Sequence, residues 1–320
     1  MDEGGLNMNE LKSSLSGMME EYLKFKESLG YKRKSYYYVL HMLDDFAIKH
    51  DYRRKDVMTK ELSMKWLEMK PTENENGRRK RALVTNDFSK FLRSMGHNSF
   101  VLPPGSFGRY VKPVPYIYTD EELLEIFKAF DNDDNPRWLP TLPVLMRFYF
   151  TTGVRPREPI ELRKDDVDLK TGACLIKDSK GHKDRLIAFS DDLTDLLRKY
   201  DTEMDVLFPN RQYFFIYKGC KIQLSTLRDE FHRCFDTTHI ESNGRKRPRL
   251  YDWRHNFASR SLQMMLEDDK DFDSLMVVLS EYMGHVEFRD TYYYISILPA
   301  NLIHTGKLDW AGMPEVPYEN

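Results

Sequence analysis

Apolar residues in the first third of the chain recur at the spacing of a helix. The segments "LSGMMEEYLKFKESLG" and "RRKRALVTNDFSKFLRSMG" both follow this spacing, and they end at Gly30 and Gly96. Two segments between them, "SYYYVLHMLDDFAIKH" and "ELSMKWLEMK", show the same pattern. Glycine is common just past a helix end because it adopts the left-handed conformation without strain. The pattern predicts four short helices that form a small all-α domain over residues 1–101.

The helical pattern stops at residues 102–118, where four prolines and two glycines predict an extended linker. Thr119 follows, and three carboxylates come directly after it. A hydroxyl at this position accepts a hydrogen bond from a free helix N–H group, and the helix dipole stabilises carboxylates in the first turn. A second domain is therefore predicted over residues 119–302, with a C-terminal tail over residues 303–320.

Two short strands are predicted inside the second domain. "ACLIK" (Ala173–Lys177) and "RLIAFS" (Arg185–Ser190) are joined by "DSKGHKD", which places Gly181 at the tip of a hairpin. The remaining segments have helical patterns, apart from loops such as "ESNGRKRPR". The expected fold class is mainly α, of the α+β type, with helices in both domains and a small antiparallel sheet in the second.

Composition narrows the class of protein only a little. The chain has 320 residues, of which 41% are hydrophobic and 31% charged, so it is long enough for two cores. The formal net charge of −2 neither requires nor excludes a nucleic-acid partner, because a basic face can coexist with acidic surfaces.

Cysteine spacing and hydropathy set further limits. The three cysteines are odd in number and have no CxxC spacing, so neither a disulfide framework nor a metal site is expected. The N-terminus is acidic and polar, unlike a signal peptide, and no apolar run approaches the roughly 18 residues of a membrane span. We therefore expect a cytoplasmic protein that makes no membrane contact.

Four segments of the second domain carry residues suited to chemistry on an anion. In "TTGVRPREPIEL", Arg155 lies at a helix start, where free N–H groups and a two-pronged guanidinium suit phosphate oxygens, and Glu158 follows one turn later. Taken alone, such a pair is usually a surface salt bridge. In "SKGHKDR", Lys180 and Lys183 lie in the hairpin tip, where a lysine can reach a nucleic-acid groove or protonate a leaving oxygen. Charged turns are nevertheless usually only solvated.

The other two segments lie nearer the C-terminus. In "RKRPRLYDWRHNFASRSL", Arg254 and His255 begin a helix after a basic loop that suits a phosphate backbone. Such loops are often only solvated, and a lone buried histidine is more often a hydrogen-bonded core residue than a catalyst. In "MGHVEFRDTYYYISI", His285 follows a glycine at a helix end, and residues 292–294 are three consecutive tyrosines. Packing is the usual role for any one of them.

Together and in this order, the four segments resemble the tyrosine recombinase (phage integrase) family. "TGVRPRE" is similar to its first Arg box, "SKGHKDR" to its hairpin Lys, "YDWRHNFA" to its His-x-x-Arg box and "MGHVEFRDTYYY" to its Gly-His…Tyr box. The resemblance covers roughly residues 119–302, and the N-terminal helical domain resembles the family's core-binding (SAM-like) domain. It implies a site-specific DNA recombinase or integrase that needs no metal or cofactor.

The resemblance also implies roles for individual residues. The family's nucleophile falls nine residues after the histidine, which selects Tyr294, whereas residues 292–293 point elsewhere on a helix and are expected to pack or to contact DNA. The two arginines would clamp the phosphate, the histidine would add a hydrogen bond, the lysine would protonate the leaving 5′-oxygen, and the tyrosine would become a 3′-phosphotyrosine. The expected catalytic set is Arg155, Lys180, Tyr251, Arg254, His285 and Tyr294, with Glu158 and His255 in support.

The chain departs from the family at Tyr251, where the family most often has the His of the His-x-x-Arg box. A phenol with an ordinary pKa near 10 can hydrogen-bond a phosphate, but it accepts protons poorly at neutral pH. His255 does not inherit that role by position, because it directly follows the arginine.

The expected partners are double-stranded DNA with a specific recombination site and three further copies of the chain, which would exchange strands through a Holliday junction. Accessory recombination proteins are further candidates, and the nucleoid is the expected location. The C-terminal tail would dock on a neighbouring protomer or fold back on its own domain. Basic residues outside the catalytic set are expected to contact phosphates, namely Arg78, Arg79, Lys80, Arg81, Lys183, Arg245, Lys246 and Arg247.

Two rival functions fit part of this pattern. A type IB topoisomerase-like nicking–closing enzyme shares the catalytic set, although the small helical N-terminal domain favours a recombinase. A catalytically weak or inactive DNA-binding accessory factor is favoured by Tyr251. The filled catalytic set with a divergent box favours a mobile element, and hence integration or transposition, as the biological setting.

Overall fold

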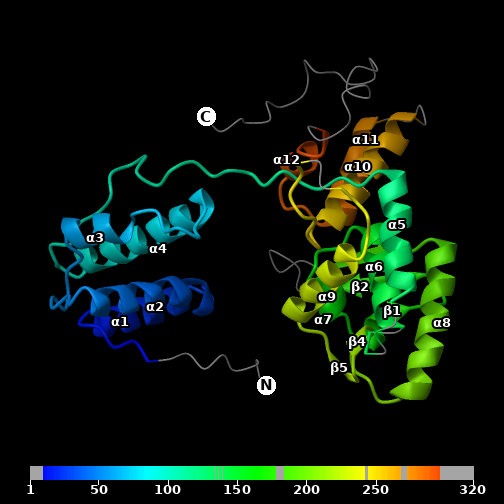
Figure 1. Ribbon diagram of the computed structural model, residues 1–320, viewed down its shortest axis with the longest axis horizontal. Helices are drawn as coiled ribbons and strands as arrows, with labels where there is room; N and C mark the ends of the chain where they lie inside the picture. The colour runs from blue at the N-terminus through cyan, green and yellow to red at the C-terminus, as the bar shows by residue number, and fades with distance from the viewer. Residues whose placement is uncertain are drawn as a thin grey trace. The chain divides into compact units, whose positions relative to one another are not determined.

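The computed structural model describes residues 10–133, 135, 137–138, 140–177, 184–241, 244–267 and 272–295. The chain divides into two compact units, of which one ends at Pro113 and the other begins at Val114. Figure 1 shows the first unit in blue and cyan and the second in green to orange. In the described part of the chain, none of the helices is both long and apolar enough to cross a membrane.

Helices build the first unit, as the sequence predicted. They are α1 (Ser16–Ser28), α2 (Lys34–Lys49), α3 (Lys60–Trp66) and α4 (Glu75–Ser94). α2 packs against the other three helices, and α1 also packs against α4. Large apolar side chains fill the space between them, including Tyr22, Leu40, Leu43, Trp66, Phe88 and Leu92.

Local sequence signals set the limits of these helices. Thr59 and Asn74 precede α3 and α4, and their side chains accept hydrogen bonds from the N–H groups of Leu62 (3.2 Å) and Gly77 (2.8 Å). Gly30 follows the end of α1 with a φ of +83°, the left-handed conformation expected of a helix-ending glycine.

The second unit is also mainly helical. Its helices are α5 (Asp120–Asp131), α6 (Thr141–Thr152), α7 (Glu158–Glu161), α8 (Asp191–Leu207), α9 (Leu224–Asp236), α10 (Asp252–Glu267), α11 (Phe272–Met283) and α12 (Arg289–Tyr292), with the 3-10 turn η1 (Lys164–Asp166). The predicted start of α5 is confirmed as a capping box, because the Thr119 hydroxyl accepts from the Glu122 N–H (3.2 Å) and the Glu122 carboxylate accepts from the Thr119 N–H (3.0 Å).

A small antiparallel sheet lies within these helices. Its strands β1 (Val167–Asp168), β2 (Ala173–Ile176) and β3 (Arg185–Ala188) pair in the order β1-β2-β3. Both predicted strands are confirmed, and Cys174 pairs with Ile187 with both side chains buried. A further short pair, β4 (Ile216–Tyr217) with β5 (Cys220–Lys221), was not predicted. Lys180 and Lys183 lie outside the described residues, as does the tail over residues 303–320.

The core of the second unit is centred on Trp253 of α10. Its ring stacks on those of Tyr118 (5.0 Å between centroids) and Phe127 (5.6 Å), and its side chain is fully buried. Asn256, one turn along α10, donates to the carbonyl of Tyr116 (2.8 Å) and accepts from the N–H of Tyr118 (2.8 Å). The core therefore fixes the start of α10 and the segment that leads into the unit.

The segment between the two cores is shorter than the predicted linker. Leu102 is buried in the core of the first unit, whereas Tyr116 and Tyr118 are buried in that of the second. The Asn76 side chain of α4 accepts a hydrogen bond from the N–H of Val111 (2.9 Å) and donates one to the carbonyl of Val111 (2.7 Å).

Candidate active site

The C-terminus of α11 is the centre of the candidate site. Gly284 follows the helix with a φ of +67°, its N–H donates to the Glu281 carbonyl (2.9 Å), and the His285 N–H donates to the Ser280 carbonyl (3.0 Å). These two hydrogen bonds form a Schellman motif. The last carbonyls of a helix have no partner within it, and here those of Tyr282 and Met283, followed by that of Gly284, need other donors.

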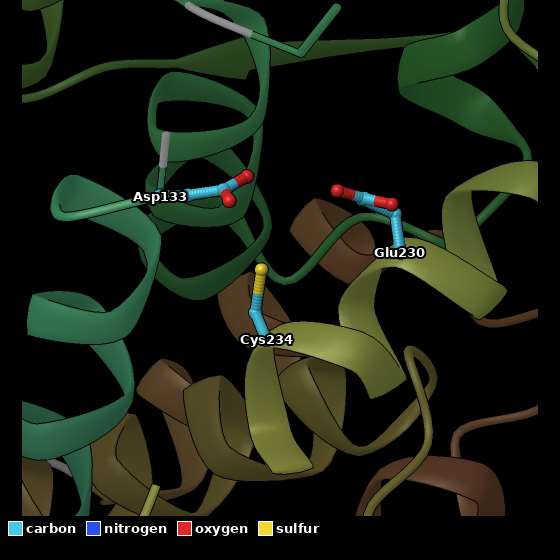
Figure 2. Close-up of side chains that lie close together, drawn as sticks. All are labelled: Asp133, Glu230 and Cys234. Atoms are coloured by element: carbon cyan, nitrogen blue, oxygen red, sulfur yellow. The ribbon is translucent and has the colours of Figure 1, made fainter. Parts of the chain in front are cut away.

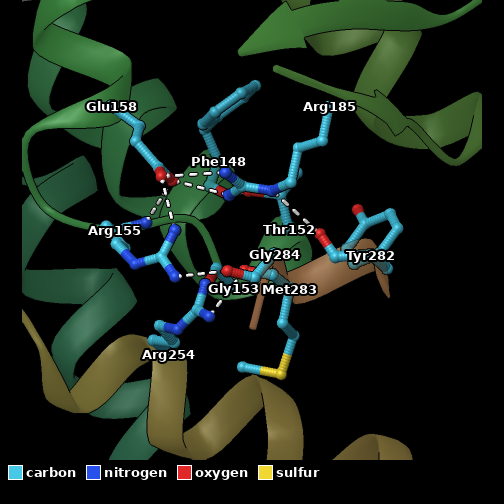
Figure 3. A network of polar contacts seen from close by, with 10 residues as sticks. All are labelled: Phe148, Thr152, Gly153, Arg155, Glu158, Arg185, Arg254, Tyr282, Met283 and Gly284. Carbon is cyan, nitrogen blue, oxygen red and sulfur yellow. Dashed lines mark hydrogen bonds and ion pairs between the residues drawn. The ribbon is translucent and has the colours of Figure 1, made fainter. Parts of the chain in front are cut away.

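Three arginines from distant segments supply the missing donors (Figure 3). Arg185 Nε donates to the Tyr282 carbonyl (3.0 Å), Arg254 Nη2 to that of Met283 (2.7 Å), and Arg155 Nη2 to that of Gly284 (2.7 Å). The negative end of the helix dipole favours cations here. One helix end therefore gathers three guanidinium groups that would otherwise repel one another.

Glu158 balances part of this positive charge. Its carboxylate accepts from the Arg155 backbone N–H (2.7 Å) and from Arg155 Nη1 (3.0 Å). It also accepts from Arg185 Nη1 (2.9 Å) and Nη2 (2.7 Å). Burial alone would raise the pKa of Glu158, but Arg185 and Arg155 lower it to about 2. The interpretation of Arg155 and Glu158 as a surface salt bridge is wrong, because their side chains are only 15% and 7% exposed.

Arg254 is held from two sides. Its Nη1 donates to the carbonyl of Gly153 (2.8 Å), opposite the contact of Nη2 with α11. Gly153 ends α6 with a φ of +59°, and a Cβ there would lie 2.3 Å from the Phe257 ring. Arg254 is 1% exposed, and burial lowers its pKa. Its Nε is buried and has no hydrogen-bond partner among the described residues.

Tyr294 lies beside the two predicted phosphate ligands His285 and Arg254. Its ring stacks on that of His285, with centroids 5.9 Å apart and planes 15° apart. Burial raises the pKa of Tyr294 to about 12, while Arg254 acts in the opposite direction. Tyr292 packs instead on Phe288 (5.0 Å between centroids), and Tyr293 lies against the His255 ring (6.0 Å). His285 is oriented by a 2.7 Å hydrogen bond between its Nδ1 and the hydroxyl of buried Thr291.

Tyr251 and His255 lie one turn apart at the start of α10. Tyr251 is 41% exposed, and its ring contacts that of His255 at 5.3 Å. Both residues lie near Tyr294, the candidate nucleophile. The ring centroids of His255 and Tyr294 are 5.6 Å apart, and Tyr251 contributes to the raised pKa of Tyr294. Burial lowers the pKa of His255 to about 4, so its ring is neutral at pH 7.

The residues predicted to contact DNA differ in how exposed they are and in what they bond. Arg81 is 2% exposed and hydrogen-bonds Glu73 and backbone carbonyls, so the prediction is wrong for this residue. Arg245 bonds Glu122 and stacks over the Tyr116 ring at 4.4 Å, which gives it a structural role. Arg247 bonds Asp236 and the His232 carbonyl. Lys80 and Lys246 are exposed, and Arg78 and Arg79 are half-buried.

Sequence reasoning missed Arg185 as part of the site. Its position directly after the segment that joins the two predicted strands was a weak signal that it lies close to the site, but its partner Glu158 precedes it by 27 residues. Gly284 was recognised only as a helix end. A Cβ there would also lie 2.9 Å from Arg185 Cδ, so this glycine is needed both for its φ and for the close approach of the arginine.

A second polar cluster, formed by Asp133, Glu230 and Cys234, has donor atoms within 4.8 Å of one another (Figure 2). Arg233 Nη2 already contacts Asp133 Oδ1 (2.5 Å) and Glu230 Oε1 (2.6 Å). Burial raises the pKa of Cys234 to about 12, which keeps the thiol protonated. A guanidinium that occupies both carboxylates makes this an ion-pair network rather than a metal centre.

Comparison with known proteins places this geometry in context. Residues 117–300 match the model of the phage integrase family. A putative integrase/recombinase of Sinorhizobium fredii is 23% identical over 309 residues, which cover 90% of this chain and 94% of the relative. The tyrosine recombinase XerC of Oceanobacillus iheyensis is 24% identical over 322 residues, with 92% and 95% covered.

The fold also matches solved structures. A lambda integrase tetramer bound to a Holliday junction superimposes with a TM-score of 0.67 over 87% of this chain and 76% of that chain. The two sequences are 16% identical, so the match shows a shared fold.

Proposed function

This chain belongs to the phage integrase family and is a tyrosine-type site-specific recombinase, and we propose that Tyr294 is the nucleophile with which it cuts and rejoins DNA. The observation that carries the proposal is the arrangement around the C-terminus of α11. Arg155 and Arg254 bond two consecutive carbonyls there, and Tyr294 stacks on His285 directly beyond them.

The charge of the site suits attack on a phosphodiester. Among the described residues that make the hydrogen bonds of this cluster, there are three guanidinium groups and one carboxylate: Arg155 and Arg185 bond Glu158, and Arg254 lies near enough for its charge to interact with it. Attack on phosphorus builds negative charge on the non-bridging oxygens, and fixed donors stabilise that charge without reorganisation. We assign Arg155, Arg254 and His285 to these oxygens.

The reaction then proceeds by transesterification. The Tyr294 hydroxyl gives its proton to solvent water and its oxygen bonds to phosphorus, while the bond to the 5′-oxygen breaks, which leaves a 3′-phosphotyrosine. We propose that Lys180 protonates the departing 5′-oxygen. The covalent link preserves the energy of the phosphodiester, so a 5′-hydroxyl of another strand can reverse the step without a nucleotide cofactor.

Access to this nucleophile requires movement. Tyr294 is 3% exposed and Arg254 is 1% exposed. A phosphate in contact with both side chains therefore requires α12 to shift from its position here. We propose that DNA binding causes this shift, which brings the Tyr294 hydroxyl and the Arg254 guanidinium to the phosphate.

We further propose that the active assembly is a homotetramer on two copies of a specific DNA site. The lambda integrase relative in this fold class forms a tetramer on a Holliday junction. A mobile element, and thus integration or transposition, is the setting we favour. Lys180 and Lys183, together with exposed Lys80 and Lys246 and half-buried Arg78 and Arg79, are our candidates for further DNA contacts.

A covalent-trapping experiment tests the proposal. The protein's own site is obtained by selecting bound duplexes from a randomised library. A nick just beyond the cleavage point lets the short fragment that carries the freed 5′-hydroxyl diffuse away. We expect the wild type, Tyr292→Phe and Tyr293→Phe to accumulate a covalent protein–DNA adduct on denaturing gels. Tyr294→Phe should form none, because it lacks the attacking oxygen.

The controls separate the rival functions. An adduct in Tyr294→Phe would reject Tyr294 as the nucleophile. Binding of the selected duplex by the wild type without any adduct would favour an accessory DNA-binding factor. Relaxation of a supercoiled plasmid that lacks the selected site would favour a nicking–closing enzyme.

A further inference from the structure

Arg185 is the third arginine of the site and has no role in the expected catalytic set. Its Nε, Nη1 and Nη2 are each engaged by a protein acceptor: the Tyr282 carbonyl and the two carboxylate oxygens of Glu158. Its side chain is 8% exposed. An arginine whose three nitrogen atoms all bond protein oxygens is poorly placed to bind a phosphate, so its function must be exerted through its partners.

The partner that matters most is Glu158. Arg185 meets its carboxylate end-on through two parallel hydrogen bonds, the geometry that fixes both the position and the plane of a carboxylate. The same two oxygens then accept from Nη1 and from the backbone N–H of Arg155. The orientation of Arg155 is therefore determined by a carboxylate that Arg185 holds in place.

Arg185 also joins two elements that carry the predicted chemistry. It is the first residue of β3, directly after the segment that contains Lys180, and its Nε bonds the last turn of α11, which ends beside His285. Gly284 leaves room for this contact, since a Cβ there would lie 2.9 Å from Arg185 Cδ.

We propose that Arg185 is a positioning residue of the cleavage reaction, which aims Arg155 through Glu158 and fixes the base of the lysine hairpin against α11. The inference rests on the proposed function. It predicts that loss of Arg185 lowers the rate of cleavage while leaving DNA affinity nearly unchanged.

Variants at this position give graded expectations. Arg185→Gln removes the charge and both parallel hydrogen bonds, and we expect single-turnover adduct formation to slow roughly a hundredfold, the loss typical of a misplacement of about 1 Å. Arg185→Lys keeps the charge but supplies one nitrogen instead of three, so its rate should lie between those of Arg185→Gln and the wild type. Arg198→Gln in α8, which removes a half-exposed arginine, is the matched control and should cleave normally.

The pH profile supplies a readout that loss of packing alone would not produce. Glu158 faces Arg155, Arg185 of β3, Arg254 of α10, Tyr149 of α6 and Cys174 of β2. With Arg185 present, the pKa of Glu158 stays at about 2, below the working range. Without Arg185, burial is opposed mainly by Arg155, and the pKa of Glu158 rises.

The direction of the pH dependence follows from which protonation state of Glu158 is active. The charged carboxylate orients Arg155, so the cleavage rate of Arg185→Gln should fall as the pH drops through the raised pKa of Glu158. The double variant Glu158→Gln/Arg185→Gln has no carboxylate to protonate, so it should lack this acidic limb. The wild type should lack it as well.

The experiment therefore measures adduct formation between pH 5 and 9 on the selected nicked duplex, with affinity measured in parallel and folding checked by circular dichroism. A slowed Arg185→Gln with an acidic limb and unchanged affinity supports the proposal, and Arg185→Lys carries the same test if the glutamine variant fails to fold. Cleavage by Arg185→Lys and Arg185→Gln at the wild-type rate and pH profile overturns it. If the wild type forms no adduct, the proposed function fails and this inference falls with it.

Discussion

Buried arginines serve different purposes in the two units. In the first unit, Arg81 stacks over the Trp66 ring at 4.6 Å, bonds the Glu68 carbonyl (3.0 Å), and pairs with Glu73 through Nε (2.6 Å) and Nη2 (2.5 Å). One cation meets one carboxylate there. In the second unit, Arg155 and Arg185 share the carboxylate of Glu158, and these two arginines and Arg254 each bond a carbonyl at the C-terminus of α11.

The comparison separates a structural arginine from a functional cluster. A cation that is balanced by one carboxylate and by helix-end carbonyls holds a fold together. A cluster with more cations than anions carries an electrostatic cost in the free protein, and an anionic ligand such as a phosphate relieves that cost. Both sites use the free carbonyls at the end of a helix, so burial alone does not identify function.

The two kinds of arginine should differ clearly in their effect on the rate of cleavage. Arg254→Lys should slow adduct formation roughly a hundredfold to a thousandfold. Lysine keeps the charge, but its one nitrogen cannot bond the carbonyls of Gly153 and Met283 and a phosphate at the same time. Single-turnover kinetics on the nicked duplex measure the rate. Arg81→Lys is the counterpart, and in the folded protein it should leave this rate unchanged. A comparable rate loss in both variants would remove the distinction.

A distinct effect should appear in stability. Arg81→Met leaves the Glu73 carboxylate, which is 11% exposed, without its cation, and should lower the free energy of unfolding of the first unit by about 3–5 kcal/mol. Hydrogen exchange of the α3 and α4 amides in the full chain, followed through a urea titration, measures the change. Lys80→Met, at an exposed position of the same helix, should change it by no more than about 0.5 kcal/mol. Equal losses would show that Arg81 has no special structural role.

The smallest effect concerns DNA affinity. Arg78→Glu and Arg79→Glu should weaken binding on all duplexes alike and reduce the slope of log affinity against log salt by about one for each phosphate that the variant no longer binds. Titrations at several salt concentrations measure the slope. Lys90→Glu, further along α4, distinguishes a local contact from a general effect of charge. An unchanged slope would remove Arg78 and Arg79 from the interface.

The sequence predicted most elements of the fold, because their signals are local. The hydroxyl of Thr119 and the glycines after α1, α4 and α11 mark helix limits within a few residues of themselves. The catalytic candidates followed from their order along the chain. The contacts that tie them together did not, because Arg185 and Glu158 are 27 residues apart and Arg155 and Gly284 are 129 apart.

The misassignment of Arg81 has a geometric reason. Residues 78–81 are four consecutive basic residues on α4, and successive helical positions are separated by about 100°. Such a run spans most of the helix circumference, so at least one member must face the core. Composition alone suggested a uniform basic surface, whereas the helical period required one residue to be buried.

The role of Tyr294 as nucleophile is tested by identifying the residue that becomes covalently bound to DNA. The trapped adduct is digested with protease and nuclease, and mass spectrometry locates the tyrosine that carries the nucleotide. The arrangement of Arg254, His285 and Tyr294 predicts that the nucleotide is on Tyr294, linked through a 3′-phosphate. A nucleotide on Tyr292 or Tyr293 would contradict the account.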